Sequence, residues 1–212
     1  MGRRALRRID PALDLSWHLK HLEEFPQPLG LDSLCGVAGP LELEVGSGKG
    51  LFLTNASGQY PQRNFVGCEL SRKYARFAAA RLARLQRPNA VVVQGDAGRF
   101  FAQLPPACAA AVHVYFPDPW WKKRHRRRRI MQPPFLRQIE RVLTPQGVLH
   151  FWTDVQEYHQ SALQDLAATT DLQGPFDTAE EPAETDMDFR THFERRMRLH
   201  GSDVWRVQFR KP

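Results

Sequence analysis

Cysteine is scarce in this chain and follows no pairing pattern. The three cysteines, Cys35, Cys68 and Cys108, are an odd number, and none belongs to a C-x-x-C pair. This excludes a disulfide-stapled miniprotein and disfavours a zinc knuckle. We therefore expect reduced thiols and no metal site.

Long hydrophobic runs are also missing. No apolar stretch approaches the roughly 20 residues that a membrane-spanning helix needs. The basic first residues are followed by Asp10 and Asp14, where a signal peptide would carry its apolar segment. We expect a cytoplasmic protein with no membrane association.

Positive charge is present in excess. The 212 residues contain 30 Lys and Arg against 23 Asp and Glu, which gives a formal net charge of +7. This excess favours an anionic partner, nucleic acid first and an acidic membrane surface second. The length suits one domain with a substantial core.

The pattern along the chain predicts an α/β fold. Residues 1–40 are expected to form an N-terminal arm that packs onto a domain of residues 41–212. Strands alternate with amphipathic helices in this domain, which predicts a parallel sheet covered on both faces. The expected strands are residues 41–45, 65–70, 90–94, 110–116 and 148–153.

The C-terminal region is expected to complete a mostly parallel, seven-stranded sheet. Residues 193–199 and 204–210 are candidates for the two closing strands. Before them, residues 177–188 hold six acidic side chains in twelve positions, which predicts a mobile loop.

A glycine-rich loop follows the first predicted strand of the domain. Residues 44–50 read E-V-G-S-G-K-G, and Gly46, Gly48 and Gly50 permit a tight turn and close approach of a ligand to the backbone. The spacing matches neither the dinucleotide fingerprint nor a Walker loop. A glycine-rich turn without a ligand is the alternative.

Two more carboxylates follow the next predicted strands. Glu69 ends the second strand, where an acid can accept both hydroxyls of a ribose, and Asp96 follows the third, within reach of an adenine edge. Each acid alone could be a helix cap or a surface group. Together they favour an adenosine-type ligand without a pyrophosphate.

The fourth strand ends in an unusual turn. Pro117 and Pro119 flank Asp118 and hold this carboxylate in an extended segment, and Trp120 and Trp121 offer flat surfaces for a base. A rigid turn with its tryptophans in the core is the alternative.

A basic run follows this turn. Residues 122–129, K-K-R-H-R-R-R-R, place seven formal cations in eight positions. Arginine suits phosphate because its planar fork can donate two parallel hydrogen bonds. We predict that Lys122 and the arginines 126–129 hold nucleic-acid phosphates; a nuclear localisation signal is the competing interpretation.

These residues resemble a known family, the bacterial tRNA (guanine-N7)-methyltransferases of the TrmB type. The likeness runs from about residue 41 to the C-terminus. It rests on E-V-G-S-G-K-G (44–50), G-C-E-L (67–70), G-D-A (95–97), F-P-D-P-W-W-K-K-R-H (116–125), R-R-I (128–130), W-T-D (152–154) and T-H-F-E (191–194). The Pro-Asp-Pro-Trp segment with its basic tail is the most specific of these.

The resemblance implies a Rossmann-like class I methyltransferase that uses S-adenosylmethionine. Its substrate would be tRNA, at guanine 46 of the variable loop, and no obligatory protein partner is expected. Asp118 would be the catalytic residue. The implied cofactor-binding residues are Glu44, Gly46, Gly48, Gly50, Glu69, Asp96 and Asp118. The implied tRNA-binding residues are Lys122, Asp154, Thr191, His192, Phe193 and Glu194, beside the predicted phosphate ligands Arg126, Arg127 and Arg128. The family usually has lysine at the position of His192.

Three other functions compete with this one. A class I methyltransferase acting on another RNA or DNA base is disfavoured because Asp118 separates the two prolines, whereas amino-methylating enzymes normally place an aromatic residue directly after two prolines. A non-catalytic RNA-binding protein on this fold would be expected to lose the glycines or acids, which are all present. The glycine spacing and the arginine run both disfavour a nicotinamide dehydrogenase.

Overall fold

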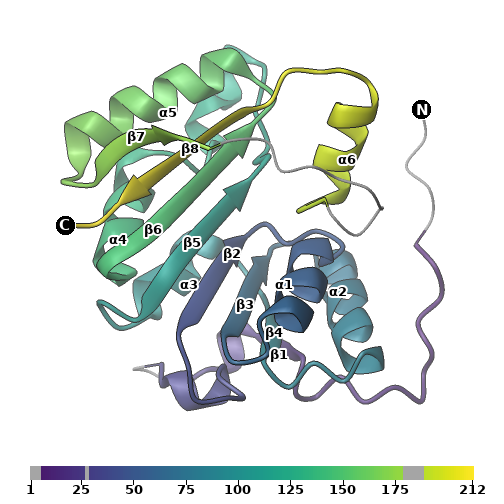
Figure 1. Ribbon diagram of the computed structural model, residues 1–212. Helices are drawn as coiled ribbons and strands as arrows, with labels where there is room; N and C mark the ends of the chain where they lie inside the picture. The colour runs from purple at the N-terminus through teal and green to yellow at the C-terminus, as the bar shows by residue number, and fades with distance from the viewer. Residues whose placement is uncertain (1–5, 27–28, 179–188) are drawn as a thin grey trace.

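The five predicted strands of the domain form one parallel sheet. The computed structural model describes residues 6–26, 29–178 and 189–212. The strands are β2 (Leu41–Val45), β3 (Asn64–Glu69), β4 (Ala90–Gln94), β5 (Ala109–Tyr115) and β6 (Leu143–Thr153). They pair in the order β4-β3-β2-β5-β6 (Figure 1). The predicted α/β fold is confirmed.

Three further strands extend the sheet at its edges. β8 (Trp205–Arg210) corresponds to the strand predicted at 204–210 and pairs antiparallel with β6, while β7 (Gln173–Asp177) pairs antiparallel with β8. β1 (Leu19–His21) pairs parallel with β4 at the opposite edge. The described residues therefore form an eight-stranded sheet, and seven of its strands lie after residue 40.

The prediction of a strand at residues 193–199 is wrong, because these residues lie in helix α6 (His192–Leu199). The Thr191 hydroxyl accepts a hydrogen bond from the backbone N–H of Glu194 at 2.9 Å, and the Glu194 carboxylate accepts one from the backbone N–H of Arg190 at 2.7 Å. A Thr-x-x-Glu pattern of this kind marks a helix start. Of the predicted acidic loop, residues 179–188 lie outside the described residues.

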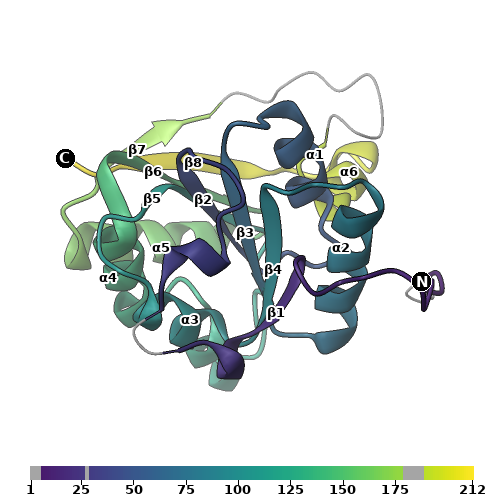
Figure 2. The same ribbon diagram turned by 90° about the horizontal axis from the view of Figure 1, so that it is seen from below.

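Helices cover the sheet on both faces, as predicted. On one face, α1 (Leu51–Gln59) and α2 (Arg72–Arg84) share a core with Phe65 and Val92. On the other, α3 (Ala97–Gln103), α4 (Pro133–Val142) and α5 (Gln156–Thr169) pack on a second core that includes Val112 and Leu149 (Figure 2). Every helix in the described part of the chain is too short or too polar to cross a membrane.

The N-terminal arm is built into the edge of this sheet. Beside the pairing of β1 with β4, the Trp17 indole donates a hydrogen bond to the Pro88 carbonyl at 2.9 Å, and Leu22 and Leu34 are buried in the core. The sequence predicted that the arm packs onto the domain but not that it contributes a strand. A three-residue strand carries too short a pattern to be read from sequence.

Candidate active site

The order in which the chain adds strands to the sheet reverses between β2 and β5. From β2 the chain adds β3 and then β4 on one side, and it returns to add β5 and β6 on the other. Ligands of open α/β sheets bind in the crevice outside the carboxyl ends of the strands at such a point. The glycine loop after β2 and the Pro-Asp-Pro turn after β5 both lie there (Figure 1).

The glycine loop depends on backbone conformations that other residues rarely adopt. Gly46, Gly48 and Gly50 have φ values of 79°, 53° and 69°. A Cβ atom at Gly46 or Gly48 would meet no atom within 4 Å, so the space beside both residues is open to a ligand. A Cβ at Gly50 would lie 2.7 Å from the Cβ of Ala78, so this glycine also lets α1 approach α2 closely.

Glu69, at the end of β3, holds the glycine loop. Its Oε2 accepts a hydrogen bond from the backbone N–H of Gly48 at 2.8 Å, and its Oε1 accepts one from the backbone N–H of Ser71 at 2.8 Å. A carboxylate offers about four acceptor sites, so Glu69 can accept further hydrogen bonds from a ligand. Its position after β3 is the one predicted for a ribose-binding acid.

Asp96 lies exposed at the end of β4, where it caps α3. Its Oδ1 accepts a hydrogen bond from the backbone N–H of Arg99 at 2.9 Å. The sequence allowed both a helix cap and a ligand contact for this acid, and the structure shows the cap. The α3 helix was not predicted.

Glu44 is the buried acid of the site. It lies on β2 with 3% of its surface exposed. Burial raises the pKa of its carboxyl to about 8; the nearby Ser47 hydroxyl opposes this rise, and the Glu69 charge reinforces it. Among the described residues, no partner has suitable hydrogen-bond geometry for Glu44 Oε2 or Ser47 Oγ. Buried polar atoms without partners indicate a ligand or ordered water.

The Pro-Asp-Pro turn is held between two unusual backbone conformations. Phe116 and Trp120, which flank it, have φ values of 49° and 47°. Non-glycine residues rarely adopt positive φ, and such residues cluster at functional sites. Asp118 is exposed between them. It lines a hollow of about 370 Å³ together with Pro119, Trp120, Trp121, Lys122 and His125.

The basic run lies beside this hollow in the 3-10 turn η3 (Lys123–Arg128). Lys122 and the arginines Arg126, Arg127 and Arg128 are exposed, as phosphate binding requires. The Arg128 guanidinium lies 5.1 Å from the centre of the Trp120 ring. Arg129 differs from the prediction: it is 5% exposed and bonds inward, so it does not present its guanidinium to a phosphate.

The C-terminal segment reaches the same edge of the sheet. The Phe193 ring lies 5.0 Å from that of Phe116, between ring centres. Arg81, on α2, lies 3.3 Å from a ring nitrogen of His192 and donates a hydrogen bond to the Lys49 carbonyl at 3.2 Å. The chain thus brings this C-terminal segment close to both the glycine loop and the Pro-Asp-Pro turn, although the segment lies far from both in sequence.

Two of the predicted tRNA-binding residues are less accessible. Glu194 is buried, and its carboxylate lies 3.5 Å from the Arg198 guanidinium and holds the start of α6. Asp154 is half-buried and directly follows β6. A third predicted residue, Thr191, uses its hydroxyl to accept the capping hydrogen bond at the start of α6.

Comparison with known proteins identifies the family. The family model Methyltransf_4, described as "Putative methyltransferase", matches residues 38–207. The tRNA (guanine-N(7)-)-methyltransferase of Rhodopirellula baltica is 45% identical over all of this chain and 80% of its own length. That of Cupriavidus necator is 38% identical over 88% of this chain and 72% of its own. The chain belongs to the tRNA (guanine-N7)-methyltransferase family.

Solved structures support the fold. The 16S rRNA methyltransferase KamB superposes with a TM-score of 0.64 and 21% identity, over 89% of this chain and 95% of its own. The Rossmann-like methyltransferase fold and the family predicted from the sequence are both confirmed. The sequence does not predict the inward orientation of Arg129. This orientation has no local signal, because it depends on Pro119 and Glu157, which lie 10 and 28 residues away in the chain.

Proposed function

We propose that this family member transfers a methyl group from S-adenosylmethionine to N7 of a guanine in tRNA, at guanine 46 of the variable loop. One observation carries the proposal: Asp118 is exposed on a rigid turn at the switch point, between the glycine loop and the basic run. Such a position suits a group that must face both a cofactor and an RNA base. We further propose that the protein acts in the cytoplasm without an obligatory protein partner.

The residues around the glycine loop fit S-adenosylmethionine. This cofactor supplies an electrophilic methyl group on a sulfonium ion. The space beside Gly46 and Gly48 is open, Glu69 has remaining acceptor sites, and Glu44 Oε2 has no hydrogen-bond partner within residues 6–26, 29–178 and 189–212. These features suit a nucleoside with a cationic amino-acid tail. The proposed cofactor-binding residues are Glu44, Gly46, Gly48, Gly50, Glu69, Asp96 and Asp118.

Asp118 is proposed to orient the guanine and to stabilise it as it becomes charged. Guanine N7 already carries an in-plane lone pair, so the chain needs no general base to create the nucleophile. Its main task is alignment of the two reactants. A carboxylate that accepts hydrogen bonds from guanine N1–H and the exocyclic amine would exclude adenine and stabilise the positive charge that develops on the purine.

The basic run and the C-terminal segment are proposed to hold the tRNA. Lys122, Arg126, Arg127 and Arg128 are exposed beside the hollow and would bind phosphates. Asp154 and the segment of residues 191–194 would form the opposite wall. In that segment, His192 is exposed and Phe193 is half-buried, and both would contact the tRNA directly, whereas Glu194 would act by holding α6.

Replacing Asp118 by Ala tests this function. We expect Asp118→Ala to lower methyl transfer from labelled S-adenosylmethionine to tRNA by roughly a hundredfold, the size found when a transition-state-stabilising group is removed. The tRNA Kd, measured by filter binding, should change little. Asp171→Ala, an exposed acid beyond α5, is the matched control. Failure of the wild-type protein to label tRNA would refute the function, and unchanged turnover in Asp118→Ala would refute the role of Asp118.

A further inference from the structure

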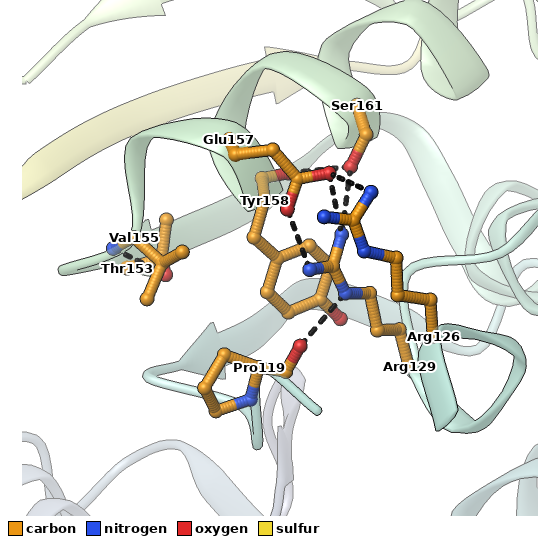
Figure 3. Close-up of polar contacts among 8 residues, drawn as sticks. All are labelled: Pro119, Arg126, Arg129, Thr153, Val155, Glu157, Tyr158 and Ser161. Carbon is orange, nitrogen blue, oxygen red and sulfur yellow. Dashed lines mark hydrogen bonds and ion pairs between the residues drawn. The ribbon is translucent and has the colours of Figure 1, made fainter. Parts of the chain in front are cut away.

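The buried arginine of the basic run is tied to the Pro-Asp-Pro turn. Arg129 is 5% exposed, and its Nε donates a hydrogen bond to the carbonyl of Pro119 at 2.8 Å (Figure 3). Its guanidinium lies 4.5 Å from the centre of the Tyr158 ring. Pro119 directly follows Asp118, so this bond fixes the backbone on one side of the proposed catalytic carboxylate.

The other end of Arg129 is anchored to α5 through Glu157. Arg129 Nη2 donates to Glu157 Oε2 at 2.6 Å, and Nη1 donates to Oε1 at 3.2 Å. Nη1 also lies 3.4 Å from the Ser161 hydroxyl. A bidentate arginine–carboxylate pair fixes orientation as well as distance. The turn is therefore connected to a helix that packs on the core.

Glu157 serves a second cation at the same time. Its Oε1 lies 3.0 Å from Nη1 of Arg126, and both of these side chains are 46% exposed. Figure 3 shows the two arginines converging on the one carboxylate. Hydrogen bonding from Arg129 lowers the pKa of Glu157, so this group stays ionised at neutral pH. The paired Arg126 is also one of the proposed phosphate ligands.

We propose that Arg129 and Glu157 form a positioning clamp for Asp118, and that Glu157 is the counter-ion that an RNA phosphate displaces from Arg126. This proposal rests on the proposed function. Arg129 is expected to keep its pair with Glu157, because breaking it would leave the buried guanidinium of Arg129 without a carboxylate partner. The exposed Arg126 pair is weak and exchangeable. One carboxylate thus connects the RNA-binding surface with the position of the catalytic turn.

Two variants separate this proposal from a purely structural role. Glu157→Gln removes the negative charge and the bidentate pair from an exposed position. We expect kcat to fall by about tenfold, because small misplacement of a reacting group is costly. We expect the tRNA Kd to become about threefold tighter, since one exposed opposing charge is removed from the phosphate-binding surface. Loss of folding alone would not strengthen RNA binding.

Arg129→Lys tests the clamp separately. It keeps the charge but loses the fork that joins Pro119 to Glu157, so we expect kcat to fall by about tenfold with an unchanged tRNA Kd. The control is Arg141→Lys: Arg141 also donates to backbone carbonyls, those of Phe101 and Leu104, but it joins α4 to the end of α3. We expect this variant to lose thermal stability while its kcat is retained.

The results that would overturn the proposal are specific. An unchanged kcat in Glu157→Gln would exclude the clamp. Weaker tRNA binding by the same variant would exclude the counter-ion role. An equal loss of kcat in Arg129→Lys and Arg141→Lys would reduce Arg129 to a structural residue. A wild-type protein that binds but does not methylate tRNA would refute the proposed function, while the affinity of Glu157→Gln would still decide whether Glu157 competes with phosphate.

Discussion

Glu44 shows how a single buried residue can link this fold to its ligand. Its carboxyl is almost completely buried below the glycine loop, and burial raises its pKa from 4.5 to about 8. A protein core tolerates a carboxyl of this kind when it is neutral or paired with a cation. The proposed cofactor carries such a cation, so the acid is suited to the bound state more than to the free protein.

The stability of the free protein should therefore depend on pH through Glu44. The folded-state pKa lies above the unfolded value, so the stabilising contribution is complete below about 4.5 and is lost as the pH rises to about 8. Glu44→Gln cannot ionise. Its Tm relative to the wild type should rise across this range and level off above it, as followed by circular dichroism.

The control for this measurement is Glu24→Gln, which changes an exposed glutamate outside the glycine loop. A Tm difference between Glu44→Gln and the wild type that does not vary with pH would contradict the account of Glu44.

At the scale of elements, β3 and the glycine loop fit together through Gly67. A Cβ atom at this position would overlap Ser47 Oγ and would lie 2.6 Å from Leu53 Cδ1. A side chain at residue 67 would therefore push the loop away from the strand. The G-C-E-L segment thus contributes a glycine that seats the loop in addition to the acid Glu69.

Gly67→Ala should weaken cofactor binding. Overpacking costs about 1–3 kcal/mol, so we expect the Kd for S-adenosylmethionine to rise by roughly tenfold as the loop shifts, measured by isothermal titration calorimetry. Gly30→Ala is the matched control, because its Cβ would meet no atom within 4 Å and its φ is −84°. A lower Tm with an unchanged Kd would show that Gly67 supports the fold but not the ligand site.

The elements differ in how well the sequence predicts them. The strands at 41–45 and 90–94 agree with the structure to the residue. Residues 90–94 read A-V-V-V-Q, an apolar run that marks a strand buried on both faces, whereas residues 41–45 read L-E-L-E-V and alternate apolar residues with glutamate. β7 contains Gly174 and Pro175, which are atypical of a strand interior, and it depends on pairing with β8. The sequence pattern at residues 193–199 predicts a strand where the structure has α6, although the Thr-x-x-Glu pattern at 191–194 indicates a helix start.

The candidate site also contains residues that the sequence predicts and residues that it does not. The position of the glycines and acids could be predicted, because each lies at or just after the carboxyl end of a strand, and parallel strands bring these ends to one edge. The burial of the Arg129 side chain could not be predicted. It directly follows three exposed arginines in the sequence, and its partner Glu157 lies 28 residues further along the chain. Composition identifies a basic run but does not show which of its members is buried.

At the scale of the whole molecule, a positive surface, a ligand crevice and the exposed acid Asp118 lie at a single edge of the sheet. The excess of seven positive charges explains attraction to RNA but not the choice of base or atom. That choice is assigned to the hollow beside Asp118, which the basic run and the C-terminal segment adjoin. Identifying the atom that receives the methyl group is therefore the most demanding test.

The measurement is methyl transfer from labelled S-adenosylmethionine to two tRNAs that differ at one ring position of one base. One carries guanine at the variable-loop position, and the other carries 7-deazaguanine, in which a C–H group replaces N7 and the hydrogen-bonding edge that is proposed to face Asp118 is kept. We expect label in the first tRNA and none in the second, with equal binding of both. Equal labelling of the two would contradict N7 as the acceptor and with it the central claim.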